Sequence, residues 1–357
     1  MIRAYRFHIT VLAVLLIASL GFLFFGKNGF KAHKIKLCEN QSVAWDIPGK
    51  IKGVAMAAPP EPIGSWACDP IKDLGADWLC VMPYGFVREE GSKVIYNHPF
   101  QWWGEQRMGI IASIQIAKEQ GMRVCMKPHL WTQGVYTGSY SPPNGDSWEE
   151  FHGSYTKFII DYAKVADSLG VELLCIGTEL STAVKEEPEF WASLICHVRE
   201  VYKGKLSYAA NWDNYQNVKF WSELDVIGVN AYFPLDSSIN PSTQSVKASW
   251  ERWSSKLSDF SNEEGKQILF TELGYRSMEK GLARPWDAAH HGEFDEKLQA
   301  IAYTGFFEGI WNEPWLAGAI IWKWHSDHRK AGGPGNTRYT PQNKLAQEII
   351  TQHFTDK

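Results

Sequence analysis

The sequence has no excess of positive charge. Its 36 Lys and Arg residues stand against 40 Asp and Glu residues, which gives a formal net charge of −4. A protein that binds the phosphate backbone of a nucleic acid needs basic side chains to replace the counterions it releases. The charge balance therefore argues against a nucleic acid partner. The 45% of hydrophobic residues excludes a disordered chain.

Cysteine is scarce and forms no closely spaced pair. A chain of 357 residues buries enough apolar surface to be stable without a disulfide framework. Three of the cysteines lie within short apolar runs that are typical of strands. We therefore expect free thiols that pack as small hydrophobic side chains. The six cysteines are Cys38, Cys68, Cys80, Cys125, Cys175 and Cys196.

A long uncharged apolar run lies at the N-terminus. It extends from Ile9 to Phe25, after Arg3 and Arg6 and before Lys27. A membrane span needs roughly 17–25 apolar residues, so the run fits a signal peptide or a short membrane anchor. No small-residue cleavage site follows it, which favours an uncleaved anchor. The preceding positive charges predict that the remaining chain is exported, either membrane-anchored or secreted.

The rest of the chain shows one further change in composition. Residues 28–50 form a polar connector, and no second linker, low-complexity stretch or strong repeat follows it. We therefore predict a signal peptide or anchor at 1–27, a connector at 28–50 and a single domain at 51–357. We expect this domain to be a monomer.

Short β-type runs alternate with helical patterns throughout the predicted domain. Such alternation predicts a parallel sheet, and eight units match a closed (β/α)₈, or TIM, barrel. A doubly wound open sheet is the alternative, but the Gly-rich phosphate turn typical of it is missing after the first strand. The predicted strands are 52–57, 78–82, 123–127, 172–177, 206–210, 226–230, 267–271 and 319–324. The predicted helices are 105–120, 147–169 (opened by a capping box at Ser147), 188–202, 245–260 and 295–311.

A glutamate comes just after the end of two of the predicted strands. Glu179 follows the fourth strand and Glu272 the seventh, each between Thr and Leu and each in phase with residues expected to point into the barrel. Functional groups gather at the carboxyl ends of barrel strands, and a carboxylate near an apolar core loses solvation. The two strands lie across the barrel mouth from each other. Two carboxyls in these positions are suited to retaining glycoside hydrolysis. The competing explanation is that each glutamate forms a structural salt bridge.

Motifs at four strand ends and in the C-terminal tail point to one enzyme family. They are Gly177–Glu179, Asp225–Tyr232, Thr271–Tyr275, Ile321–Trp324 and Tyr339–Lys344. Together they resemble glycoside hydrolase family 113, which belongs to the large retaining (β/α)₈ clan and whose characterised members act on β-1,4-mannans. The resemblance covers about residues 50–350. It implies a cofactor-free β-mannanase with Glu179 as acid/base and Glu272 as nucleophile.

The residues themselves leave the substrate open. Mannose differs from glucose only at the 2-hydroxyl, so a β-glucan or xylan is an alternative substrate, and a non-catalytic cell-surface glycan-binding protein is a less favoured alternative. Asn312-Glu313-Pro314 looks like a catalytic motif of the clan but precedes the last strand, at the wrong end of the barrel. The His290-His291 and His325–His328 clusters do not predict a metal site, because the first strand does not end in His-x-His.

Other strand ends supply candidate substrate-binding residues. The phenol of Tyr232 can hydrogen-bond the nucleophile, and aromatic rings pack on the C–H faces of sugars. We expect only one of Trp322 and Trp324 to face the pocket, and we choose Trp324 because it lies nearer the carboxyl end. Core packing is the competing explanation for each aromatic residue. The candidates are His129, Trp131, Asn211, Trp212, Tyr232 and Trp324.

Overall fold

The computed structural model describes residues 45–143, 148–238 and 240–356. The chain divides into two units, residues 1–36 and 37–357, and all described residues belong to the second. The predicted anchor, most of the connector and Ser147 of the predicted capping box lie outside the described residues. Among the residues described, no helix combines the length and apolar character that crossing a membrane requires.

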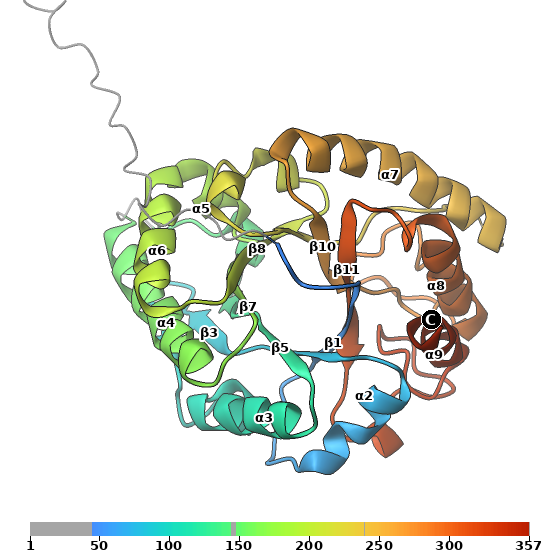
Figure 1. Cartoon of the computed structure of the whole chain (residues 1–357), viewed down its shortest axis with the longest axis horizontal. Coiled ribbons are helices and arrows are strands. Elements are labelled where there is room, and N and C mark those ends of the chain that lie inside the picture. Colours follow the sequence, from blue (N-terminus) through green and yellow to red (C-terminus); the bar gives the residue numbers. More distant parts are fainter. Residues whose placement is uncertain (1–44, 144–147, 239, 357) are drawn as a thin grey trace, which may run out of the picture. The chain divides into compact units, whose positions relative to one another are not determined.

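Eight parallel strands close into a barrel, with helices around its outside (Figure 1). Starting from β1, each strand pairs with the next in chain order among the eight, and the last pairs with the first. All eight predicted strands and the TIM barrel are thus confirmed. The barrel strands are β1 (Ile51–Met56), β2 (Trp78–Val81), β5 (Arg123–Met126), β7 (Leu173–Thr178), β8 (Lys205–Asn211), β9 (Ile227–Asn230), β10 (Ile268–Leu273) and β11 (Leu316–Trp324).

The helices that cover the strands are amphipathic and turn their apolar faces inward. In α4, for example, Phe151, Tyr155 and Phe158 recur at helical spacing and are all buried. A capping box formed by Ser242 and Ser245 begins α7. The helices are α2 (Asp69–Asp73), α3 (Arg107–Glu119), α4 (Glu149–Ser168), α5 (Ser181–Glu186), α6 (Pro188–Val201), α7 (Thr243–Glu264), α8 (Glu296–Ile310) and α9 (Leu345–Thr355).

A second, three-stranded sheet was not predicted. It contains β3 (Tyr84–Val87), β4 (Ile95–Tyr96) and β6 (His129–Thr132), with β3 in the middle. Pro83 and Pro128 each follow a barrel strand by two residues, and each is followed directly by a strand of this sheet. Proline removes a backbone donor and ends the ladder, so each barrel strand stops before its proline and the chain beyond it forms a strand of the second sheet.

A small hydrophobic cluster fills the barrel interior. Its buried residues lie on the strands or directly beside them. It includes the buried free thiols of Cys80, Cys125 and Cys175. A larger cluster lies between the strands and the helices. The expectation of free thiols is confirmed for these three and for Cys68, but it is wrong for Cys196 on α6, which is disulfide-bonded.

Candidate active site

A cavity of about 860 Å³ opens at the carboxyl ends of the barrel strands. Both Glu179 and Glu272 line it, as the positions of β7 and β10 in the barrel predicted. Four of the six candidate substrate-binding residues line the same cavity. These four are His129, Asn211, Trp212 and Tyr232.

Glu272 reaches the cavity because β10 is irregular at its end. Leu269 packs in the barrel interior, whereas Phe270 packs outside against Trp250 and Phe306. The argument from strand phase was therefore wrong for this strand. The pairing register with β9 shifts between Phe270 and Glu272, as in a β-bulge, and this shift re-aims the carboxylate.

Two strong donors hold the Glu272 carboxylate. Nζ of Lys127 lies 2.5 Å from Oε1, and the hydroxyl of Tyr232 donates to Oε2 at 2.5 Å. Lys127 is fully buried. Burial is the largest single influence and lowers the pKa of its ammonium, but the charge of Glu272, its hydrogen bond and the smaller effects of Cys80 and Cys175 together outweigh burial. The pKa therefore lies above its usual value. The ammonium therefore stays charged and stabilises the carboxylate as an anion.

Glu179 stands in different surroundings. Its backbone has φ 57, so the chain turns sharply where it leaves β7. Nδ2 of Asn230 donates to Oε1 and the hydroxyl of Tyr136 donates to Oε2, both at 2.8 Å. Burial, and then the negative charge of Glu272, raise the pKa of Glu179 to about 7, against the effect of these hydrogen bonds. Glu179 therefore keeps its proton up to neutral pH.

His129 lies beside Glu272 as a neutral ring. Its Nε2 is 3.8 Å from Oε1 of Glu272, too far for a hydrogen bond. The ring centroid lies 5.1 Å from that of Tyr84 and 5.7 Å from that of Trp322, on which it stacks. Burial, together with the charges of Lys127 and Lys323, lowers the pKa of His129 well below its usual value.

The choice of Trp324 was wrong, and Trp322 takes its place. Trp324 is fully buried outside the cavity and stacks on His328, whereas Trp322 lines the cavity. Residues two apart on a regular strand share a face, but here the register with β1 shifts between Ala55, paired with Trp322, and Met56, paired with Trp324. The irregularity separates the two rings, so nearness to the strand end does not decide which one faces the cavity.

Trp131 is not brought to the cavity. It lies on β6 in the three-stranded sheet, and its side chain is 57% exposed. Asn312-Glu313-Pro314 lies between α8 and the start of β11, at the opposite barrel end, as predicted. The Glu313 carbonyl there accepts a hydrogen bond from Nζ of Lys50 at 2.6 Å.

Sequence reasoning missed several residues that line the cavity or bond to its two glutamates. Lys127 and Asn230 lie at the ends of predicted strands, so the rule that located Glu179 could have located them. Tyr136 and Trp286 lie in long loops that carry no local signal. Trp286 stacks on Trp212 with ring centroids 4.9 Å apart. The guanidinium of Arg276, just beyond β10, donates to the carbonyls of Asp287, Ala288 and His290 and so fixes this loop.

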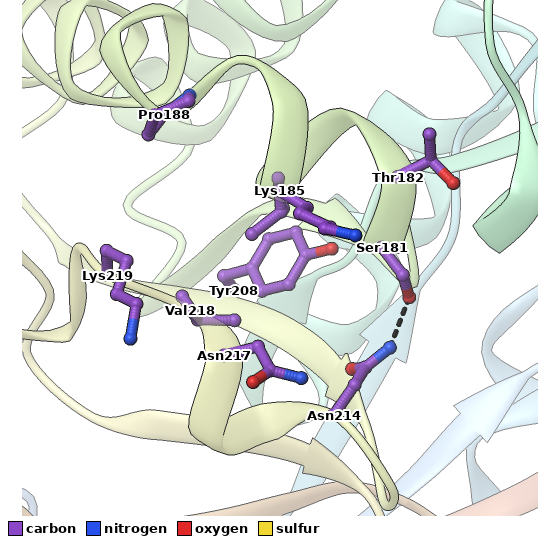
Figure 2. A pocket seen from close by; sticks show the side chains of 10 residues that line it. Ser181, Thr182, Lys185, Pro188, Tyr208, Asn214, Asn217, Val218 and Lys219 are labelled. Carbon is purple, nitrogen blue, oxygen red and sulfur yellow. Dashed lines mark hydrogen bonds between the residues drawn. The ribbon is translucent and has the colours of Figure 1, made fainter.

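A separate pocket of about 570 Å³ lies beside the turn that follows Glu179 (Figure 2). It is bounded by α5 and by the loop after β8, which the hydrogen bond between Ser181 and Asn214 joins. Neither glutamate lines it. The hydroxyl of Tyr208 accepts from the backbone N–H of Leu180 at 2.8 Å, so this pocket wall supports the turn that carries Glu179.

A closed (β/α)₈ barrel with two carboxylates in one cavity at its carboxyl end is an arrangement typical of glycoside hydrolases. The chain belongs to glycoside hydrolase family 113, whose family model matches residues 65–344. It is therefore a glycosidase. No curated protein matches the chain in sequence.

Solved structures of the same family are similar over most of the chain. The GH113 β-mannanase AaManA of Alicyclobacillus acidocaldarius, in complex with ManMIm, is 25% identical with a TM-score of 0.74, covering 88% of this chain and 99% of that one. A GH113 β-1,4-mannanase is 24% identical with a TM-score of 0.72, covering 86% and 99%. Fungal β-1,4-galactanases share the fold at 15% identity with a TM-score of 0.53, covering 79% and 89%.

Proposed function

We propose that the chain is a retaining β-mannanase that cleaves β-1,4-mannosidic bonds by double displacement. The observation that carries the mechanism is the contrast between Glu179 and Glu272 within one cavity. One carboxyl has its pKa raised to about 7, and the other is hydrogen-bonded to a buried ammonium. A carboxyl that keeps its proton beside one that is bonded to an ammonium fits a general acid and a nucleophile.

In the first step Glu272 attacks the anomeric carbon while Glu179 donates its proton to the departing oxygen. The bond from the sugar to the leaving chain breaks, and a glycosyl ester with Glu272 forms. Tyr232 and Lys127 orient the attacking carboxylate. The aromatic ring of Trp322 lies on the same cavity wall, where it can pack on a C–H face of the reacting sugar.

In the second step water replaces the enzyme at the anomeric carbon. Esterification of Glu272 removes its negative charge, and with it one of the two causes that raise the pKa of Glu179. Glu179 is then the carboxylate that takes a proton from the attacking water. Glu272 leaves as a carboxylate, and the product keeps the configuration of the substrate.

The substrate is proposed from the family. The two similar GH113 structures described above are β-mannanases, and the chain is expected to share their substrate class. Reducing-sugar release from β-mannan, β-glucan and xylan by residues 37–357 tests this. Release from mannan alone supports the proposal. Release from another glycan keeps the mechanism and rejects the substrate, and binding without release favours a glycan-binding protein.

The roles of the two glutamates are tested by the stereochemistry of azide rescue. With an activated aryl β-mannoside, Glu272→Ala cannot form the glycosyl ester, so azide attacks directly and gives the inverted α-azide. Glu179→Ala still forms the ester, and azide then displaces it to give the retained β-azide. The opposite pairing of products would exchange the two roles, and inverted products from both variants would reject double displacement.

We also propose that residues 1–27 keep the exported barrel at the membrane. The apolar run and the preceding arginines support this, as does the disulfide-bonded Cys196, because disulfides persist in oxidising compartments. The full-length chain should sediment with membranes, and replacing Leu15 and Leu16 by lysine should release it. A shortened soluble wild-type chain would instead indicate a cleaved signal peptide.

A further inference from the structure

Tyr136 lies at the cavity although no motif points to it. It directly precedes the short 3₁₀ turn η3 (Thr137–Ser139) in the loop between β6 and α4, and its side chain is 54% exposed. Its hydroxyl donates to Oε2 of Glu179 at 2.8 Å and accepts a hydrogen bond from Nδ2 of Asn211. An exposed loop thus supplies one of the two donors to Glu179.

The loop around Tyr136 is held in place from both sides. Oγ1 of Thr137 donates to the Leu130 carbonyl at 2.9 Å, and Oγ1 of Thr182 donates to the Gly138 carbonyl at 3.0 Å. A Cβ on Gly138 would lie 2.4 Å from the ring of Tyr136 and 3.0 Å from the carbonyl oxygen of Glu179. The missing side chain of Gly138 therefore provides the space in which the ring lies against the turn of Glu179.

The two oxygens of Glu179 are not equivalent. Oγ1 of Thr271 donates to Oδ1 of Asn230 at 2.9 Å, which fixes the amide with its NH₂ group toward Oε1 of Glu179. Oε1 therefore only accepts. The hydroxyl of Tyr136 can rotate, so it can donate to Oε2 when Glu179 is ionised and accept from Oε2 when Glu179 is protonated.

We propose that Tyr136 is a positioning residue that, with Asn211, keeps the transferable proton of Glu179 on Oε2 and stabilises the ionised carboxylate after the proton has left. The inference rests on the proposed function, since it assigns a role beside the acid/base. It explains how one side chain can serve both steps without moving, because a single hydroxyl accommodates both protonation states of Glu179.

Other ionisable groups also act on Glu179 or on Tyr136. Glu272 raises the pKa of Glu179 and Lys127 lowers it, whereas burial raises the pKa of the Tyr136 phenol far above neutrality and keeps it a donor. Among the described residues, only Tyr136 and Asn230 donate side-chain hydrogen bonds to the Glu179 carboxylate. The ionisable groups that face Glu179 and Tyr136 are Glu272 from β10, Lys127 after β5, Tyr208 from β8, Asp213 after β8, Tyr232 after β9 and Tyr339 before α9.

The test is Tyr136→Phe, read by the pH dependence of kcat/KM on a manno-oligosaccharide. Loss of the hydroxyl should move the basic limb of the profile to higher pH by roughly one unit and lower kcat about tenfold. Gly138→Ala, which displaces the ring, should move the limb in the same direction. A uniform loss of activity with an unshifted profile would mean a merely structural role and would overturn the inference.

Tyr96→Phe is the matched control. The hydroxyl of Tyr96 donates to Oδ2 of Asp161 at 2.5 Å, so this variant removes a similar bond away from the cavity. Its pH profile should equal that of the wild type. If the profile of this control shifts as much as that of Tyr136→Phe, the pH profile no longer supports a positioning role for Tyr136.

A titration without substrate separates this inference from the proposed function. With ¹³C-labelled glutamate, the signal lost in Glu179→Gln reports the ionisation of Glu179 directly. If the titration moves upward in Tyr136→Phe while the wild type cleaves no mannan, the positioning role stands and the proposed substrate fails. If the wild type is active but the titration does not move, the positioning role fails.

Discussion

The ends of β7 and β10 carry the same tripeptide, Thr-Glu-Leu, but surround its carboxylate differently. Glu272 is bonded to an ammonium and a phenol, whereas Glu179 is bonded only to neutral donors and lies near the charge of Glu272. The difference comes from residues on other strands and loops rather than from the tripeptide. It teaches that the role of a carboxyl in this barrel is set by its neighbours.

Removing each carboxyl in turn should have the largest effect and tests whether the two glutamates have different roles. Glu272→Gln should lower kcat/KM by at least about 10⁴-fold on every substrate, because no ester forms. Glu179→Gln should do so on mannan but much less on an aryl mannoside whose leaving group needs no proton. Initial rates on the two substrates check this. Equal sensitivity of both variants to the leaving group would contradict a division of roles.

Removing the cation should have the next largest effect. Lys127→Met leaves Glu272 in its buried position without its charged partner, so kcat should fall by roughly 10²–10³-fold. The acidic limb of the pH profile should move to higher pH, since an unpaired buried carboxylate is harder to ionise. Lys323→Met is the comparison, because the charges of Lys323 and Glu272 interact but no hydrogen bond joins them among the described residues. Its ammonium lies 5.6 Å from the Trp322 ring centroid, and its removal should have a smaller effect. A Lys127→Met enzyme with wild-type activity would contradict the role of the ammonium.

The basic limb of the wild-type pH profile of kcat/KM tests the role of Glu179 as the proton donor. The pKa of Glu179 is raised to about 7, so the acid form is present below that pH and is lost above it. We expect kcat/KM to fall about tenfold per pH unit beyond the limb. A profile that stays flat well above pH 7 would indicate that Glu179 is not the proton donor.

The smallest expected effect concerns the cavity wall. Trp286→Ala removes a ring that stacks on Trp212, and it should raise KM for long manno-oligosaccharides by roughly tenfold with little change in kcat. Trp131→Ala removes a similarly exposed ring outside the cavity and should leave both constants unchanged. Michaelis constants across a series of chain lengths check the pair. Equal effects of the two variants would show that the wall does not bind sugar.

The sequence predicted the barrel and the two carboxyls because both depend on regular features. Strand and helix periodicities are local, and a strand end in a closed barrel has a known place at the mouth. Trp324 shows where this reasoning fails. Its orientation depends on a register shift between β11 and β1, and a shift arises from pairing between segments far apart in the chain.

The cavity residues that lie in loops could not be predicted for the same reason. Tyr136 and Trp286 reach the cavity from loops whose course is set by tertiary hydrogen bonds, such as those of Arg276. A loop carries no periodicity, so its contacts cannot be read from residue spacing. Lys127 is an intermediate case, because its place at a strand end was predictable but its pairing with Glu272 across the mouth was not.

In the part of the chain that the structure describes, one cysteine is disulfide-bonded and four are buried free thiols. Burial raises the pKa of Cys68 to about 11, and hydrogen bonds with Cys175 and Cys80, together with burial, keep the pKa of Cys125 well above its usual value. Thiol exchange also needs access to the sulfur, and all four thiols are buried, so the folded protein withholds them from oxidants. Before the barrel closes they have no such protection. In an oxidising compartment, correct disulfide pairing then depends on relative rates. The barrel must fold and bury these sulfurs faster than a non-native disulfide forms.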